Sequence, residues 1–270
     1  MFQSIGFIGT GHMGGALARA AVRGAAGAPI YLANRTPEKA RKLAGELGCQ
    51  AVDNQTVARQ CDLIFLGVKP QMMEQTLGEL TPILAGRKDR FVLASMAAGV
   101  SARAVQKMGG GSCPVIRLMP NTPVSVGAGV IEYCGLDVSP QELEAFQTLM
   151  APAGLVDQIS EELIDAASAL SGCGPAFCAL MMEGLADGGV ACGLPREKAQ
   201  RYAAQMVEGA AKLLLESGMH PGEMKDGVCS PGGTTIQGVR ILEERGFRGA
   251  AMDAVIGAYE KTSSLGKKKG

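Results

Sequence analysis

The stretch IGFIGTGHMG at residues 5–14 decides the fold of the first half of this chain. An apolar run, Ile5–Ile8, leads directly into glycines with G-x-G-x-x-G spacing, and a good helix-forming run follows at 16–21. In such a loop the glycines provide a tight turn, close approach of the backbone to a pyrophosphate, and close packing of helix on strand. The helix N-terminus favours the anion. The predicted dinucleotide contacts in this stretch are Ile8, Gly9, Thr10, Gly11, His12 and Met13.

The end of the second expected strand indicates which dinucleotide binds. About 20 residues after such a loop, an Asp or Glu usually holds the ribose hydroxyls of NAD. Here the run Ile30–Ala33 ends in Asn34, Arg35 and Thr36, without a carboxylate. Asn and Thr can hydrogen-bond a 2′-phosphate, and Arg can pair with it as a charged fork. These three residues therefore predict NADPH as the cofactor, with NADH as an alternative. In the competing interpretation, Arg35 and Lys39 are only a solvated turn and helix face.

Composition excludes several other classes of protein. The chain has 270 residues, enough for one large or two ordinary domains, and its 26 basic residues balance 26 acidic ones. Nothing in this charge favours nucleic acid or an anionic membrane. No apolar run approaches the roughly 20 residues needed to span a bilayer, and no cleavable signal precedes the first strand. We therefore expect a cytoplasmic protein.

The eight cysteines contain no C-x-x-C pair, and the two histidines, His12 and His220, lie far apart in the sequence. We expect the cysteines to be reduced, small and buried, and we expect no metal site.

An alternation of strands and helices continues through the first 160 residues. A helix is expected over 37–47, capped by Thr36 and closed by Gly48, and Asn54 is expected to cap another. The continuous apolar run 62–68 is typical of a parallel strand covered on both faces. Further strands are expected at 91–95, 115–119, 129–133 and 155–157, with helices at 71–84, 101–108 and 140–150. This pattern predicts an α/β, Rossmann-like doubly wound sheet over residues 1–160.

From residue 161 to 270 the strand-like runs vanish and an all-helical domain is predicted. Helices are expected over 163–169, 175–191, 195–217, 234–245 and 249–264. Several are apolar on more than one side, for example at 177–182, and roughly 110 residues offer too little interior to bury every such face. We therefore expect this all-α domain to form a homodimer by helix packing. The alternative is a well-covered core within one chain.

Three turns that follow expected strands are unusual in composition: 67–70, 95–99 and 119–123. The carboxyl ends of parallel strands form the ligand edge of an open α/β sheet, where the glycine loop also lies. Each turn alone is compatible with an ordinary crossover, but the three together favour a nicotinamide pocket. The further dinucleotide contacts predicted in these turns are Val68, Lys69, Pro70, Ala97, Ala98 and Asn121, and Asn54 is predicted as another contact.

The segment SPGGTTIQG at residues 230–238 is the most specific part of the helical domain. Thr234 and Gln237 have capping-box spacing, which predicts that a helix begins here and that the cap uses the Thr234 hydroxyl. Gly232 and Gly233 leave the backbone bare for an anion, while Thr235 stays free for a ligand. A simple glycine-rich helix start is nearly as compatible with this segment. The predicted substrate-binding residues of this carboxylate receptor are Ser230, Gly232, Gly233, Thr234 and Thr235.

Taken together, these motifs resemble those of the pyrroline-5-carboxylate reductase family, in the same order from end to end. The resemblance implies reduction of 1-pyrroline-5-carboxylate to L-proline with NAD(P)H, the last step of proline biosynthesis. It also implies intertwined homodimers, often assembled into larger rings, with the site completed across the dimer. The segments that carry the resemblance are 6–11, 68–70, 95–99, 121–123, 170–176 and 230–235.

By that resemblance, Thr235 is the catalytic residue and hydrogen-bonds the ring nitrogen, while backbone amides around Gly233 and Thr234 hold the carboxylate. Cys173 departs from the serine usual in the family between Gly172 and Gly174.

Two other functions are compatible with parts of the sequence. A β-hydroxyacid-type NADP dehydrogenase would place a lysine base on a helix of the second domain, but no lysine lies between Lys107 and Lys198. A non-catalytic NADP(H)-sensing protein would keep the glycine loop without needing the segment 230–235.

Overall fold

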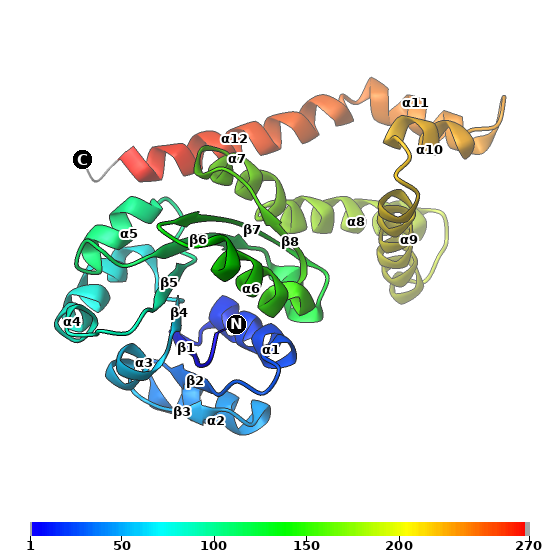
Figure 1. The fold of residues 1–270 in the computed structure, drawn as a ribbon. Coiled ribbons are helices and arrows are strands. Elements are labelled where there is room, and N and C mark those ends of the chain that lie inside the picture. The colour runs from blue at the N-terminus through cyan, green and yellow to red at the C-terminus, as the bar shows by residue number, and fades with distance from the viewer. Residues whose placement is uncertain (1, 268–270) are drawn as a thin grey trace. The chain divides into compact units, whose positions relative to one another are not determined.

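The computed structural model describes residues 2–267 (Figure 1), so the last three residues of the predicted helical domain lie outside the described residues. Contacts between Cα atoms divide the chain into two compact units. The first comprises the chain up to Cys173 together with the segment from Ala258, and the second comprises Gly174–Gly257. A division at residue 160 remains a prediction from sequence character.

An eight-stranded sheet forms the centre of the first unit, in the order β3-β2-β1-β4-β5-β6-β7-β8. Neighbouring strands are parallel except β6 and β7, which pair antiparallel. The predicted α/β, doubly wound architecture is confirmed, whereas the antiparallel pair was not predicted. The strands are β1 (Ile5–Ile8), β2 (Ile30–Ala33), β3 (Gln50–Ala51), β4 (Leu63–Leu66), β5 (Val92–Ser95), β6 (Val115–Pro120), β7 (Gly129–Leu136) and β8 (Gly154–Gln158).

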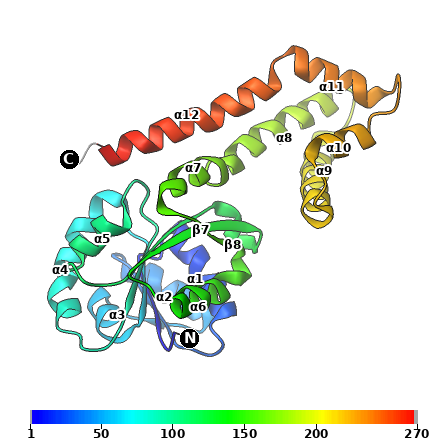
Figure 2. The same cartoon turned by 45° about the horizontal axis from the view of Figure 1, so that its top comes forward.

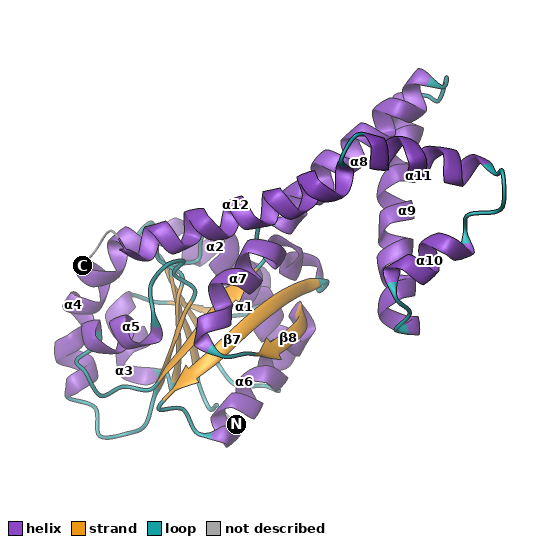
Figure 3. Ribbon diagram, turned by 90° about the horizontal axis from the view of Figure 1, so that it is seen from above, coloured by secondary structure: helices purple, strands orange, loops and turns teal. Residues whose placement is uncertain are grey.

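Helices cover both faces of this sheet, each over its own apolar core. One core takes residues from α1 (His12–Gly24), α2 (Pro37–Leu47) and α6 (Pro140–Met150). The other takes residues from α3 (Asn54–Gln60), α4 (Met73–Ala85) and α5 (Ala102–Met108). On this second face α7 (Glu161–Ser171) packs against β6 and β7 (Figure 3).

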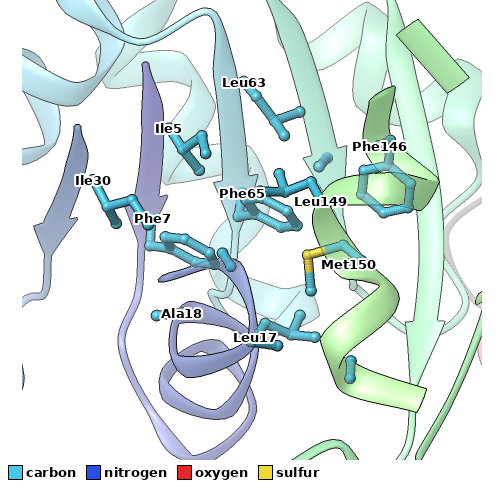
Figure 4. Packing of buried hydrophobic residues seen from close by; sticks show 14 of the residues in the cluster. Ile5, Phe7, Leu17, Ala18, Ile30, Leu63, Phe65, Phe146, Leu149 and Met150 are labelled. Atoms are coloured by element: carbon cyan, nitrogen blue, oxygen red, sulfur yellow. The ribbon is translucent and has the colours of Figure 1, made fainter. Parts of the chain in front are cut away.

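Aromatic packing fixes α6 on the first face (Figure 4). Phe7 of β1 and Phe65 of β4 stack with ring centroids 4.4 Å apart, and Phe146 of α6 lies 6.1 Å from Phe65. All three side chains are buried, with Leu17 of α1 beside them. Each buried aromatic ring removes a large apolar area from water, so this cluster is a main source of stability for the sheet.

Helix ends agree with the sequence at one site and differ at another. Thr36 is the N-cap residue of α2 at the predicted position, although its side chain makes no capping bond, and Gly48 closes this helix with a left-handed φ of 67°, as predicted. The prediction for α3 is wrong: Asp53, not Asn54, is the cap, because its carboxylate accepts the Thr56 N–H at 2.7 Å. Asn54 is instead the first helical residue.

The second unit is helical, as predicted (Figure 2). One short helix was missed, α10, in which the Nδ1 atom of His220 accepts the Gly222 N–H. The helices are α8 (Gly174–Ala191), α9 (Arg196–Ser217), α10 (Pro221–Gly227), α11 (Thr234–Glu244) and the first part of α12 (Phe247–Lys267).

Much of the apolar surface of this unit is uncovered. Its buried cluster contains only alanines, at 186, 199 and 203, whereas Leu180 is 71% and Leu215 is 85% exposed. Within the described residues, the stretch Glu161–Ala191 is also long and apolar enough to cross a membrane by length and composition, with a mean hydropathy of 1.4. That stretch is an exception to our expectation from the sequence. It comprises two helices, α7 and α8, and α7 packs on the sheet.

The cysteines are less uniformly buried than expected. All eight are free thiols, but only Cys61, Cys113 and Cys134 are buried, while Cys178 and Cys192 are exposed. Burial raises the pKa of Cys61 to about 12 and that of Cys134 to about 11. At neutral pH these two thiols are therefore protonated core side chains and not nucleophiles.

The start of α6 provides a pH-dependent test of stability. Ser139 and Glu142 form a capping box, and the Arg90 guanidinium binds Glu142 at 2.6 Å. The bond from Arg90, assisted by Ser139, lowers the pKa of Glu142 from 4.5 to about 2. Glu142→Gln is expected to lower the free energy of unfolding at pH 7 by about 1–2 kcal/mol.

A carboxyl group whose pKa is lower in the folded protein stabilises it above the unfolded pKa, and this contribution is lost as the pH falls through the folded pKa. The difference between wild type and Glu142→Gln should therefore shrink between pH 7 and about pH 3 in urea unfolding experiments. Glu144→Gln, at an exposed position of the same helix, is the control. A difference that stays constant with pH would contradict the assignment.

Candidate active site

The three glycines of the first loop have three different surroundings. Gly9 has a φ of 96°, and a Cβ atom there would lie 2.7 Å from backbone atoms of Gly67. A Cβ atom on Gly14 would overlap the carbonyl oxygen of Gly9, whereas one on Gly11 would meet nothing within 4 Å. Gly9 therefore makes the turn, Gly14 allows the helix to approach the strand, and Gly11 leaves an open backbone approach. This arrangement fits a pyrophosphate group.

The N-terminus of α1 supplies free donors beside this open approach. Gly11 is the N-cap residue and has no side-chain cap. The amides of His12, Met13 and Gly14 are in the first turn, where α-helical N–H groups have no intrahelical partner. Thr10 is only 7% exposed, and its hydroxyl has no hydrogen-bond partner among the described residues. The loop thus offers backbone donors, a helix dipole and one unused hydroxyl to an anion.

Asn34 connects the end of β2 to the glycine loop. Its Oδ1 atom accepts the Thr10 N–H at 3.2 Å, and its Nδ2 atom donates to the Thr36 carbonyl at 3.1 Å. Arg35 and Thr36 are exposed, and no ion pair involving Arg35 is found in residues 2–267. Asn34 therefore orders the loop, while Arg35 is available to a phosphate group.

A basic cavity lies between α1 and α2. It is lined by the glycine loop at Thr10–His12 and by Arg19, Lys39 and Lys42. Arg19 is paired with Glu46 at 2.5 Å, so the two lysines supply the unneutralised charge. Such a surface attracts the phosphates of a dinucleotide.

The turns that follow β4 and β5 lie at the same edge as the glycine loop, because β1, β4 and β5 are parallel neighbours. The Gly67 N–H donates to the Ile8 carbonyl at 2.8 Å, which joins the first turn to β1. Beyond it, Val68 and Pro70 are half-buried and Lys69 is exposed. After β5, Ala97 is buried and Ala98 is exposed. The two alanines are small residues, which is compatible with the approach of a planar ring.

Asn121, at the end of β6, already has partners for its side chain. Its Oδ1 atom accepts the Val130 N–H at 2.9 Å, and its Nδ2 atom donates to the Ser171 carbonyl at 3.1 Å. This side chain therefore joins β6, β7 and the end of α7. A contact between Asn121 and the nicotinamide remains a prediction.

Arg117 of β6 was not identified from the sequence. Its buried guanidinium binds Asp165 at 2.5 Å and Glu161 at 3.4 Å, both on α7. A single arginine within the apolar run VIRLM, residues 115–119, was the signal that could have revealed it, because a charge in a buried strand requires partners.

The segment 230–235 forms a tight turn before α11. The Gly233 N–H donates to the Ser230 carbonyl at 3.0 Å, Pro231 follows Ser230, and Gly232 has a φ of 69°. These are the features of a type II turn. The Gly233 N–H is therefore occupied, and the first-turn amides of Thr234, Thr235 and Ile236 are the donors left for an anion.

The predicted capping box is wrong, although the helix begins at Thr234 as expected. The N-cap residue is Gly233, and no side chain caps α11. Thr234 and Thr235 are both exposed, and no hydrogen bond from either hydroxyl is found in the described part of the chain. The sequence argument that only Thr235 has a free hydroxyl therefore fails, and the choice between the two threonines needs an experiment.

Two family models match the chain. Residues 161–265 match pyrroline-5-carboxylate reductase dimerisation, and residues 4–99 match NADP oxidoreductase coenzyme F420-dependent. A pyrroline-5-carboxylate reductase of Escherichia coli (strain K12) is 39% identical over 271 residues, which cover 99% of this chain and 100% of that relative.

Solved structures give the same result. A pyrroline-5-carboxylate reductase from Coxiella burnetii is similar with a TM-score of 0.88 and 33% identity, covering 98% of this chain and 99% of that one. The Plasmodium falciparum pyrroline carboxylate reductase with NADP bound has a TM-score of 0.86 and 30% identity, covering 98% of both chains.

The glycine loop makes a prediction with an internal control. Gly14→Ala is expected to lower the melting temperature because the new methyl group overlaps the Gly9 carbonyl oxygen. Gly11→Ala meets no atom within 4 Å, so it should leave the melting temperature of the free protein within a few degrees of wild type. It should still weaken NADPH binding about tenfold, because the methyl group occupies the approach of the pyrophosphate.

Differential scanning calorimetry and titration of NADPH fluorescence measure the two effects. Gly45→Ala, at an open position on α2, is the control for a neutral substitution. Unchanged NADPH affinity in Gly11→Ala would show that the dinucleotide binds elsewhere.

Proposed function

This chain belongs to the pyrroline-5-carboxylate reductase family. We propose that its glycine loop binds the cofactor and that its segment 230–235 binds the substrate. The enzyme reduces 1-pyrroline-5-carboxylate to L-proline with NAD(P)H, the last step of proline biosynthesis. Full-length similarity to the reductase of Escherichia coli, at 39% identity, is the observation that carries this function.

The dinucleotide is assigned to the carboxyl edge of the sheet. The first-turn amides of α1 would hold its pyrophosphate, with Gly11 giving the close approach. Arg35 would bind the 2′-phosphate, since it is exposed and no ion pair to it is found in residues 2–267. The residues after β4 and β5, Val68–Pro70 with Ala97 and Ala98, would surround the nicotinamide.

The substrate carboxylate is assigned to the turn at Ser230–Gly233 and the N-terminus of α11. The free amides of Thr234, Thr235 and Ile236 and the helix dipole favour an anion there. Ser230 and Gly232 shape the turn, and the carbonyl of Ser230 holds the Gly233 N–H. Thr235 is proposed to hydrogen-bond the ring nitrogen and to donate or relay a proton to it.

This chemistry requires little acid–base machinery from the protein. A protonated cyclic imine accepts hydride readily, and the bound nicotinamide supplies that hydride. Holding two reactants in a near-attack geometry contributes roughly 7–11 kcal/mol to lowering the barrier. The chain's own contribution is therefore to bind, to orient and to place one hydroxyl beside the ring nitrogen.

A homodimer is proposed as the functional assembly. The helical unit matches a dimerisation domain and leaves apolar side chains such as Leu180 and Leu215 largely exposed. A partner chain that covers them would remove this apolar surface from water. The exposed apolar helix α8, within the stretch of membrane-spanning length, is accounted for in the same way. A cytoplasmic location is proposed from the relatives, which are biosynthetic enzymes.

The function is tested by following the loss of reduced-nicotinamide absorbance with and without 1-pyrroline-5-carboxylate. The proposal expects oxidation of NADPH only when the imino acid is present, with L-proline as the product by mass spectrometry. Binding of NADPH without turnover would indicate a dinucleotide-sensing protein. Turnover of a β-hydroxyacid instead of the imine would indicate the dehydrogenase alternative.

The role of Thr235 is tested against its neighbour. Thr235→Ala is expected to lower kcat about a hundredfold, because the donor beside the ring nitrogen is lost. Thr234→Ala removes an equally exposed hydroxyl one residue earlier and should lower kcat less than about threefold. Steady-state kinetics with the imino acid measure both, and Thr235→Ser should restore most of the activity. Normal turnover in Thr235→Ala, or a larger loss in Thr234→Ala, would overturn the assignment.

The role of Arg35 is tested by comparing cofactors. Arg35→Ala is expected to raise the KM for NADPH about tenfold or more while leaving the KM for NADH nearly unchanged, because only NADPH carries the 2′-phosphate. Arg41→Ala, on the exposed surface of α2 with Glu38 as its partner, is the matched control. Equal losses with both cofactors would contradict the phosphate assignment.

A further inference from the structure

The polar contact between α7 and the sheet centres on Arg117. The side chain of Arg117 is only 6% exposed, and its two carboxylate partners, Glu161 and Asp165, lie one helical turn apart on α7. Glu161 Oε1 also accepts the Ala102 N–H, at the start of α5, at 2.7 Å. This cluster therefore joins β6, α5 and the first half of α7. A buried guanidinium has a defined geometry with its acceptors, so the cluster fixes where α7 lies.

The other end of α7 is held by the residue that directly follows the same strand. Asn121, four residues after Arg117, donates to the Ser171 carbonyl in the last turn of α7. The same side chain accepts the Val130 N–H of β7. Arg117 and Asn121 thus hold the two ends of one helix on β6. Any shift of α7 has to break or distort the bond from Asn121 to Ser171.

Few apolar contacts would hold α7 in place if these bonds were lost. The fully buried apolar side chains on this helix are Ile164 and Ala169, beside the buried hydroxyl of Ser168. On the sheet beneath α7, Glu132 of β7 is also buried and lies on the same face as Cys134. Cys134 is the β7 residue directly opposite Arg117 in the sheet. Apolar contacts are non-directional, whereas hydrogen bonds depend steeply on angle and distance. The position of α7 therefore depends on a few polar contacts.

We propose that Arg117 is a positioning residue for the reductase reaction. Through Asp165 and Glu161 it holds α7, and through Ser171 this helix holds Asn121 and the turn that begins there, Asn121–Pro123. That turn follows β6, at the carboxyl edge to which the nicotinamide is assigned, and Ser171–Cys173 lies beside it through the bond from Asn121. In this proposal Arg117 acts through α7 and not by contact with a reactant. This inference rests on the proposed function, because its effect is measured as turnover.

The proposal is tested with Arg117→Met, which keeps the length and apolar stem of the side chain and removes its charge. It is expected to lower kcat/KM for 1-pyrroline-5-carboxylate about ten- to a hundredfold, since misplacement by about 1 Å can have an effect of this size. The dissociation constant for NADPH should change less than about twofold, because the phosphate loop belongs to β1 and α1. All assays are run well below the melting temperature of each variant.

Two further variants separate positioning from general stability. Arg90→Met removes another arginine–carboxylate pair, with Glu142, from the segment before β5, and should leave kcat/KM unchanged. Asp165→Asn is a milder change that should lower kcat/KM several-fold if Arg117→Met does not fold. In a protein that carries both Arg117→Met and Asp165→Asn, the two losses of kcat/KM should not add, because both substitutions remove the same contact.

Three outcomes distinguish a failure of the proposed function from a failure of the positioning role. A wild-type protein without imine reductase activity would refute the proposed function itself. An active wild type with Arg117→Met and Asp165→Asn variants that melt earlier but keep their kcat/KM would refute positioning alone. A loss of kcat/KM with intact NADPH binding, absent in Arg90→Met, would support it.

Discussion

The backbone at Gly9, Gly14 and Gly67 packs together with no side chain between the segments, and the dinucleotide edge depends on this contact. A Cβ atom at any of the three positions would overlap or crowd the backbone of another. The contact sets the distance between β1, α1 and the turn after β4. Because that distance is fixed by backbone atoms, the first-turn amides of α1 are preorganised before any ligand arrives.

Side chains stabilise this edge, but the backbone contact sets its shape. Asn34 joins the glycine loop to the end of β2, and Asn121 joins the end of β6 to β7 and α7. Both amides use their bonds on the protein, so they act chiefly by ordering backbone. The groups left for ligands are backbone amides, the Thr10 hydroxyl and exposed cations such as Arg35. The same logic applies to the turn at Ser230–Gly233, where a bond within the turn leaves the next amides free.

Local sequence signals explain which features were predictable. The glycine loop, the apolar strands and the caps at Thr36 and Gly48 depend on neighbouring residues, and each lies where the sequence places it. The antiparallel pairing of β6 with β7 depends on a turn whose direction the apolar pattern does not encode. The cap at Thr234 failed because Gly232 and Gly233 close a type II turn first, which makes Gly233 the boundary residue. The partners of Arg117 are more than 40 residues away and are invisible to local patterns.

The two units differ in how much of their apolar surface is buried. The sheet buries its apolar strands on both faces, so its ligand edge is a stable platform within one chain. The helical unit buries mainly alanines and leaves most of its leucines exposed, and the proposed partner chain would cover this apolar surface. The turn at Ser230–Gly233, to which the substrate carboxylate is assigned, belongs to this second unit. In the proposed homodimer, assembly and substrate binding would therefore involve the same unit, whereas the proposed cofactor site lies within the first unit.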